Sequence, residues 1–317
     1  MRFANRKIAS PALPRSARAP SAPHILLLPP PTMMGLALPL AAGACKRIDS
    51  GQVNARCSHG TFIDVGANRG DTLAAFYASS AVGGLFSPVL RLSGSTQTPW
   101  SFCTYSFEAN PMWTATLLES AQAALPNVSA HGGSLTVCTE TAVTAGDAGP
   151  EVTLYVDPRL TAGSATIVRE KMNIPKHARR DVVSTLDLPR WLANHTRAKA
   201  QRRFTGGMMP PVILKMDIEG AEYSIMRELV SSGFMCHNVD VLVVEWHRGK
   251  LNASLAVPLE VDTTLQWLLS TPSCKMRLFG IGLTCPGIGK VDAAAAAAGK
   301  GNRCGRRGTE TLVPLDD

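Results

Sequence analysis

Acidic residues, glycines and a histidine gather at four places in the sequence where an apolar run ends. The first place is Asp64–Thr72 (DVGANRGDT), in which Gly66 and Gly70 stand four residues apart. Glycines let a chain turn tightly from a strand into a helix and keep its backbone close to a ligand. Asp64 precedes this turn, and a carboxylate near a buried strand end needs a partner. A plain strand–helix turn explains the glycines, whereas a ligand with a cation or hydroxyl groups also explains Asp64.

The second place is Glu108, which ends an apolar run and precedes Asn110 and Pro111. Nucleoside-binding folds carry an acid at the end of their second strand, because one carboxylate can accept hydrogen bonds from both ribose hydroxyls. Glu108 lies further from the glycine turn than usual, and the intervening 83–99 segment accounts for the excess. The competing interpretation is that Glu108 only caps a helix that begins at Pro111.

The third place is the run from Lys215 to Glu222 (KMDIEGAE). Lys215, Asp217 and Glu219 alternate along a predicted strand, so their side chains share one side of it. Several acids at the end of a buried strand are costly unless they are paired or bind a ligand or a metal. A structural network between Lys215 and the acids is the alternative to a binding site.

The fourth place is Glu245-Trp246-His247, at the end of a second strongly apolar strand. Glu245 and His247 are two residues apart and therefore share a side. A histidine beside carboxylates can act as a general base near neutral pH. A purely structural role for His247 stays open, because a single histidine carries no signature of catalysis.

Alternating strands and helices must position these four places. The strands are expected at 61–66, 101–108, 127–143 (one or two), 151–156, 182–186, 212–218, 240–247 and 275–281, and the helices at 71–81, 111–125, 188–200, 221–232 and 261–269. Residues 83–99 are expected to form a long surface loop. Continuous apolar strands that alternate with helices predict an α/β fold, with a doubly wound, mostly parallel sheet and helices on both faces. In such a sheet, ligands bind at the carboxyl ends of the strands.

The composition excludes wholesale disorder, because 45% of the 317 residues are hydrophobic and 18% are charged. The formal charge of +8 raises the question of nucleic-acid binding. Seven Lys/Arg and no acid precede Asp49, so the remaining 269 residues account for only +1. The basic character thus belongs mainly to the amino-terminal segment, and no nucleic-acid partner is expected.

The two ends of the chain differ from the middle. Residues 1–48 are basic and rich in Pro and Ser, and the run Met33–Cys45 is apolar but too short to span a membrane. This leader fits a secretory signal or anchor first and an organelle transit peptide second, while a disordered extension or a mis-assigned start stays open. We expect its removal to leave folding intact. A single domain is expected over 55–285, and residues 290–317 are expected to be disordered.

Eight cysteines and three N-glycosylation sequons bear on the compartment. None of the cysteines forms a CxxC pair, so a zinc site has no support and no metal ligand is assigned. Their even number permits disulfides in an oxidising lumen, although the sequence does not choose among the pairings. The sequons at Asn127, Asn194 and Asn252 point the same way. Buried thiols are the alternative.

The four places together resemble the FkbM family of S-adenosylmethionine-dependent methyltransferases. The matching blocks occur in the family's order and are FIDVGANRGDT (62–72), SFEANP (106–111), STLD (184–187), LKMDIEGAE (214–222) and VVEWH (243–247). The resemblance implies a class I, Rossmann-like methyltransferase sheet. It departs from the family at Ala109, where proline is common, and in the long 83–99 segment.

The resemblance also implies roles for matching residues. The loop around the methionine part of S-adenosyl-L-methionine would comprise Asp64, Gly66, Ala67, Asn68 and Gly70. Ribose hydroxyls would bind Glu108. On the acceptor side, we expect Asp217 and Glu219 to orient the acceptor and His247 to take its proton, with a rate that rises through a group titrating near neutrality.

The function that the sequence favours is O-methylation of a hydroxyl on a sugar, another glycan acceptor or a small metabolite. A catalytically silent Rossmann-like binding or scaffold domain is the alternative. A nicotinamide enzyme is disfavoured, because the dinucleotide pattern GxGxxG is missing. Secretory lumen or membrane anchoring through the leader is the expected location, and an organelle is the second choice.

Overall fold

The computed structural model describes residues 45–47, 59–80, 83–92, 98–146, 148–157, 165–169, 174–203, 210–247, 257–272, 274, 276–284 and 309–314. The leader up to residue 44, residues 285–308, Asn252 and three of the eight cysteines lie outside these segments. Within the described segments, no helix is both long and apolar enough to cross a membrane.

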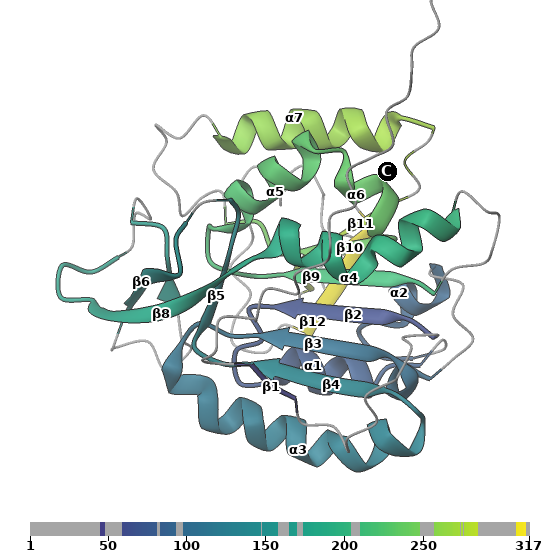
Figure 1. Ribbon diagram of the computed structural model, residues 1–317, viewed down its shortest axis with the longest axis horizontal. Coiled ribbons are helices and arrows are strands. Elements are labelled where there is room, and N and C mark those ends of the chain that lie inside the picture. Colours follow the sequence, from purple (N-terminus) through teal and green to yellow (C-terminus); the bar gives the residue numbers. More distant parts are fainter. Residues whose placement is uncertain are drawn as a thin grey trace, which may run out of the picture. The chain divides into compact units, whose positions relative to one another are not determined.

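Eight strands form the larger sheet in the order β1-β4-β3-β2-β9-β10-β11-β12 (Figure 1). The six inner strands run parallel, and β1 and β12 pair antiparallel at the two edges. The strands are β1 (Cys45–Arg47), β2 (Thr61–Val65), β3 (Cys103–Phe107), β4 (Ser134–Cys138), β9 (Val212–Met216), β10 (Val241–Val244), β11 (Arg277–Thr284) and β12 (Thr309–Pro314). The doubly wound, mostly parallel sheet predicted from sequence is therefore confirmed.

Helices cover both faces of this sheet, as the continuous apolar strands require. One face packs against α1 (Asp71–Tyr77), α2 (Ser87–Leu92) and α3 (Thr114–Ala130). The other packs against α4 (Leu188–Arg203), α5 (Glu222–Ser231), α6 (Phe234–Asn238) and α7 (Val257–Ser270). Two short 3₁₀ helices, η1 (Pro99–Ser101) and η2 (Pro111–Trp113), flank β3.

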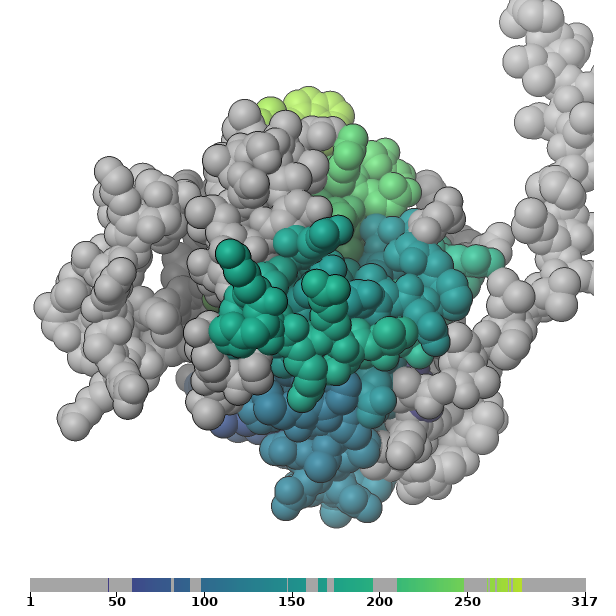
Figure 2. Space-filling model, turned by 90° about the vertical axis from the view of Figure 1, so that its left-hand side faces the viewer, coloured from purple at the N-terminus to yellow at the C-terminus, as the bar shows by residue number. Residues whose placement is uncertain are grey.

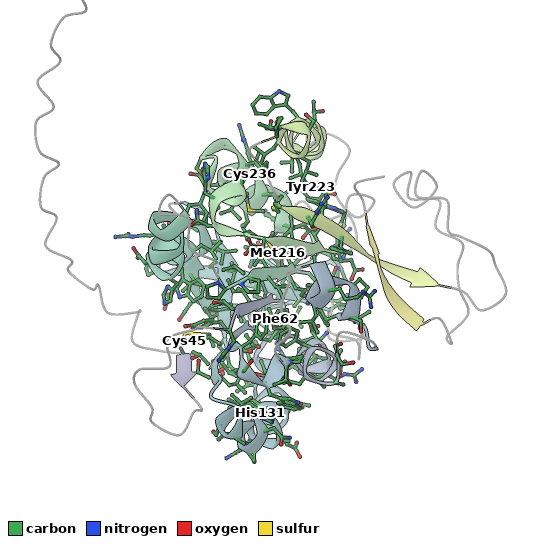
Figure 3. The ribbon with its side chains drawn as sticks, turned by 90° about the vertical axis from the view of Figure 1, so that its right-hand side faces the viewer. Cys45, Phe62, His131, Met216, Tyr223 and Cys236 are labelled. Atoms are coloured by element: carbon green, nitrogen blue, oxygen red, sulfur yellow. A yellow bond between two sulfur atoms is a disulfide. The ribbon has the colours of Figure 1, made fainter. Side chains whose placement is uncertain are left out.

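Aromatic packing fixes the first face. The Phe62 ring of β2 stacks on that of Phe76 of α1, with centroids 3.9 Å apart, and Phe86 meets both rings edge-on. Figure 3 shows Phe62 and, on the neighbouring strand, Met216 near the middle of the sheet. Phe86 and Val89 are buried, so part of the expected 83–99 loop instead forms α2. Burial of these apolar side chains against the sheet outweighs the high glycine and proline content of the segment.

A second, smaller sheet was not anticipated from the sequence. Its order is β5-β8-β6-β7, with β5 (Thr141–Thr144), β6 (Glu151–Val156), β7 (Ala165–Thr166) and β8 (Arg179–Asp187). The strands were expected individually, but a period of two cannot tell which sheet a strand joins. This sheet lies beyond the carboxyl ends of β2 and β3 (Figure 1), with its own apolar cluster around Leu154 and Val183.

Both edge strands come from segments that the sequence assigned to the leader and the tail. Cys45–Arg47 pairs with β4, and Cys45 forms a disulfide with Cys138 (Figure 3 labels Cys45 beside β1). Thr309–Pro314 pairs with all but the first two residues of β11. Neither segment has a strong local preference for a strand, and backbone pairing with an open sheet edge supplies the missing stabilisation. The folded unit therefore extends beyond the 55–285 range at both ends. Removal of residues 1–48 would delete β1 and the Cys45–Cys138 disulfide, so the structure contradicts the expectation that this removal leaves folding intact.

Candidate functional site

A pocket opens at the carboxyl ends of the inner parallel strands, where a doubly wound sheet binds its ligands. Its lining includes Gly66, Asn68 and Glu108, together with Asp217 and Glu219. The smaller sheet closes the pocket with residues of β5, β6 and β7. Figure 2 looks onto this end of the sheet, with β8 and its neighbours in teal at the front.

The Gly66 turn brings backbone to the edge of the pocket. Gly66 has φ 82°, and a Cβ there would lie 1.9 Å from the carbonyl oxygen of Asp217. The backbone amides of Gly66 and Ala67 both donate to the carbonyl of Phe107 at 3.0 Å, which joins this turn to the end of β3. Only glycine fits position 66, because the contact is with backbone that cannot move aside.

Two further residues of this turn adopt left-handed backbone. Asn68 has φ 53° and Gly70 has φ 93°, directly before α1 begins at Asp71. A Cβ at Gly70 would lie 2.7 Å from the Cβ of Ser120 on α3. Gly70 thus permits α1 and α3 to pack closely and does not itself line the pocket.

Glu108 is 7% exposed and joins two loops through its carboxylate. One oxygen accepts from the Asn68 amide at 2.6 Å and the other from the Asn110 amide at 2.7 Å. Burial raises the pKa of Glu108 to about 7, although the two amides and the Lys215 charge act to lower it. Each carboxylate oxygen has a second lone pair, so Glu108 can also accept hydrogen bonds from a ligand in the pocket. The Pro111 turn is capped by Asn110, whose side chain accepts from Met112, and not by Glu108.

Asp64 and Lys215 form a buried ion pair beneath the glycine turn. They are register partners on β2 and β9, and the Lys215 Nζ lies 3.3 Å from an Asp64 oxygen. The same ammonium donates to the Gly66 carbonyl at 2.7 Å and lies 3.7 Å from Asp217. Burial raises the pKa of Asp64. Burial acts to lower the pKa of Lys215, but Asp64 and Asp217 outweigh it and raise that pKa, so the lysine stays charged. Asp64 thus holds the ammonium that binds the Gly66 carbonyl, and it does not itself line the pocket.

The acids after β9 divide between the pocket and the interior. Asp217 and Glu219 are partly exposed and line the pocket. Glu219 has φ 58°, and its carbonyl accepts from the Thr166 hydroxyl of β7 at 2.9 Å. Glu222, in contrast, is fully buried at the start of α5 and accepts from the Gly220 amide at 2.8 Å.

His247 follows β10 and is 3% exposed. Its backbone amide and its Nδ1 both lie against one oxygen of Glu222, at 2.9 and 3.0 Å. The Nε2 faces oxygens of Asp217, Glu219 and Glu245 at 3.7, 3.7 and 3.6 Å. The ring itself does not line the pocket, whereas Asp217 and Glu219 do. β9 and β10 are parallel neighbours, which is why their terminal residues meet.

Two features show what the pocket could hold. The Asn68 Oδ1 and the Trp113 Nε1 are buried without a hydrogen-bond partner among the described residues, and both residues line the pocket. Together with Glu108 and the Gly66 turn, they suit a ligand that carries hydroxyl, amino and aromatic groups. Ligand atoms of Asp217, Glu245 and His247 lie within 4.8 Å of one another, a spacing that one metal ion could bridge.

Some functional residues escaped the sequence analysis. Trp113 was assigned to a helix, and Thr166 and Ile167 of the pocket wall lie in a segment without any recognised motif. Glu222 was assigned only to the start of α5 and not to the support of His247. An acid at the first turn of a helix commonly serves the helix dipole, so its partner could not be read from sequence.

Comparisons with known proteins agree with this geometry. The chain matches the family model described as the methyltransferase FkbM domain over residues 64–270, which is most of its length. Searches of curated proteins and of solved structures found no significant match. The matched range begins at Asp64 and includes the glycine turn, Glu108, the acids after β9 and His247. On this basis, the chain belongs to the FkbM family of methyltransferases.

Proposed function

We propose that the chain transfers a methyl group from S-adenosylmethionine to a hydroxyl of a sugar or small metabolite. The observation that carries this proposal is the pocket, which is lined by the Gly66 turn and Glu108 together with the carboxylates of Asp217 and Glu219. S-adenosylmethionine supplies a methyl group that is already activated for displacement. The chain's own task is to bind, orient and accept a proton.

The donor side of the pocket fits S-adenosylmethionine. Glu108 would accept from the ribose hydroxyls with the lone pairs that the Asn68 and Asn110 amides leave unused. The buried Oδ1 of Asn68 can accept a hydrogen bond, and the buried Nε1 of Trp113 can donate one. The Gly66 turn allows the methionine part to approach backbone, as no side chain intervenes. Asp64 and Lys215 would hold this turn in place from beneath.

The acceptor side would be formed by Asp217 and Glu219. Both carboxylates face the pocket, so either can accept a hydrogen bond from an acceptor hydroxyl and then its proton. A polar wall of this kind suits an acceptor with several hydroxyl groups. That His247 takes the proton stays a prediction, since Asp217 and Glu219 line the pocket and His247 does not.

Calorimetry on the full chain tests the donor half. S-adenosylhomocysteine should bind and NAD should not. Glu108→Ala should weaken binding by about 1–3 kcal/mol, which is the cost of leaving buried hydroxyls unpaired. The matched control is Glu119→Ala, at an exposed position of α3, which should bind normally. Equal affinity in the Glu108 and Glu119 variants would remove Glu108 from the site.

Single-turnover transfer to a panel of sugars and hydroxylated metabolites tests the acceptor half. Methylation of a hydroxyl supports the proposal, and the product's bond to oxygen can be read by mass spectrometry. Tight S-adenosylhomocysteine binding without transfer to any acceptor would favour the alternative, a catalytically silent binding domain. If the chain binds neither S-adenosylhomocysteine nor NAD, both the methyltransferase and the silent binding domain are refuted.

We further propose that the chain works in an oxidising compartment, with the secretory lumen ahead of an organelle. Two disulfides join described residues, Cys45–Cys138 and Cys236–Cys274, and Cys103 is also disulfide-bonded. Disulfides persist in secretory compartments and are rare in the cytosol. Mapping of cysteine pairs in the protein isolated from its own cells under thiol-blocking conditions tests this. Recovery of reduced Cys236 and Cys274 would refute it.

A further inference from the structure

The imidazole of His247 is held in one orientation by a carboxylate behind it. Glu222 is fully buried, and one of its oxygens lies 3.0 Å from the Nδ1 and 2.9 Å from the backbone nitrogen of His247. The other oxygen accepts from the Gly220 amide. A Glu222 carboxylate that accepts from the Gly220 and His247 amides can also accept from a protonated Nδ1 of His247. Histidines that bind metals are commonly fixed in this way by a carboxylate on their second nitrogen.

The opposite nitrogen of the ring faces a set of oxygen donors. Oxygens of Asp217, Glu219 and Glu245 lie 3.6–3.7 Å from the Nε2. These separations exceed the 2.7–3.2 Å range of a hydrogen bond. Because the Nδ1 faces Glu222, the Nε2 is the ring nitrogen that faces Asp217, Glu219 and Glu245. The Nε2 and these oxygens can therefore surround one cation.

The spacing of these atoms suits a metal ion. Two ligands at about 2.1 Å from one ion lie about 3–3.7 Å apart when they are neighbours in its coordination shell. The observed distances of 3.6–3.7 Å are at the upper end of this range. Asp217, Glu219 and Glu245 have 31, 23 and 41% exposed side chains, so an ion can enter from solvent.

We propose that His247, Asp217 and Glu245 bind a divalent transition-metal ion, with Glu219 as a further oxygen donor. One imidazole with several carboxylates favours an ion such as Mn²⁺ over Ca²⁺, which takes oxygen ligands alone. Asp217 and Glu219 also line the pocket, so an acceptor hydroxyl can reach the same ion. The ion would then lower the pKa of that hydroxyl, and a carboxylate rather than the ligated His247 would take its proton. This last role rests on the proposed methyl transfer, whereas the binding of the ion does not.

Titration with Mn²⁺ alone, followed by electron paramagnetic resonance on the full chain, tests the site. Bound Mn²⁺ loses the sharp spectrum of the aqueous ion, so binding is read without any enzyme assay. We expect one saturable site per chain. Glu245→Gln should weaken the affinity at least ~10-fold, since it replaces a charged ligand. The side chain of Glu245 is 41% exposed, so glutamine fits there without repacking the interior.

The matched control is Glu228→Gln, at an exposed position of α5 six residues after Glu222, which should bind Mn²⁺ normally. His247→Ala should also lose binding, provided that its circular dichroism and thermal midpoint show a folded protein. Absence of saturable binding, or equal affinity in the Glu245→Gln and Glu228→Gln variants, would overturn the inference. S-adenosylhomocysteine binding measured on the same samples keeps the two proposals apart: a chain that binds Mn²⁺ but not the nucleotide refutes methyl transfer and leaves the metal site standing.

Discussion

Replacing Glu108 with glutamine should change how the stability of the protein depends on pH. The carboxyl titrates near 4.5 when the chain is unfolded and near 7 when it is folded, because burial disfavours its charged form. Between these values the folded state holds the proton more tightly, so unfolding releases it. This group's contribution is therefore fully present below pH 4.5 and is lost as the pH rises through 7.

The size of the effect follows from the difference between the folded and unfolded pKa of Glu108. From pH 5 to pH 8, titration of this carboxyl lowers the free energy of unfolding by about 2–3 kcal/mol, because each tenfold change in proton affinity corresponds to about 1.4 kcal/mol. Glutamine does not titrate, so the variant does not lose this part of its stability as the pH rises. It places an NH₂ group against one of the two backbone amides, of Asn68 or Asn110, which costs about 1–3 kcal/mol at every pH.

Urea unfolding of the wild type and the Glu108→Gln variant at pH 5 and pH 8 measures both effects. The variant should be less stable at pH 5 and should recover about 2–3 kcal/mol relative to the wild type by pH 8. Other titrating groups are common to the two proteins and cancel in the comparison. The control Glu119→Gln, on the exposed surface of α3, should show no such pH-dependent difference. A difference between wild type and Glu108→Gln that stays constant across this range would refute the reasoning.

Three further predictions use the same unfolding or turnover measurements. Gly66→Ala should lower the free energy of unfolding by at least about 3 kcal/mol, because the new Cβ would overlap the Asp217 carbonyl. Gly132→Ala, at a similar φ but in open space, should lower it by only about 1 kcal/mol. Equal losses in the two variants would contradict this explanation. The paired change of Cys236 and Cys274 to serine should lower stability by about 4 kcal/mol for a separation of 38 residues, and an unchanged urea midpoint would argue against it. Asp217→Asn should slow single-turnover transfer at least ~100-fold with S-adenosylhomocysteine affinity retained; a purely structural role would instead lower the melting temperature and spare turnover.

The parallel sheet could be predicted because its strands are continuous apolar runs that end in polar residues. Val212–Met216 and Val241–Val244 are buried at every position, which is the pattern of a sheet covered on both faces. The polar residues that follow these strands lie close together, because neighbouring parallel strands end at the same edge of the sheet. Asp217 and His247 accordingly face each other at 3.7 Å.

The parts that escaped prediction depend on long-range pairing. β1 has only three residues and owes its place to β4 and to the disulfide with Cys138. β7 has two residues, pairs with Tyr155–Val156 of β6, and brings Thr166 to the pocket. Segments this short carry no period that a sequence could reveal. The buried pair of Glu222 and His247 is 25 residues apart, and nothing local links them.

The walls of the pocket come from two different parts of the chain. The Gly66 turn, Glu108 and the residues after β9 and β10 belong to the parallel sheet, whereas β5–β8 are inserted between β4 and β9. Leu154 closes the pocket from that insertion and belongs to its separate apolar cluster, whereas Thr166 also donates to the Glu219 carbonyl of the loop after β9. Substitutions there can reshape this wall of the pocket while the Gly66 turn and Glu108 keep their frame. Under the proposed methyl transfer, evolution or a protein engineer could thus exchange one acceptor for another by rewriting a single contiguous stretch of about 50 codons.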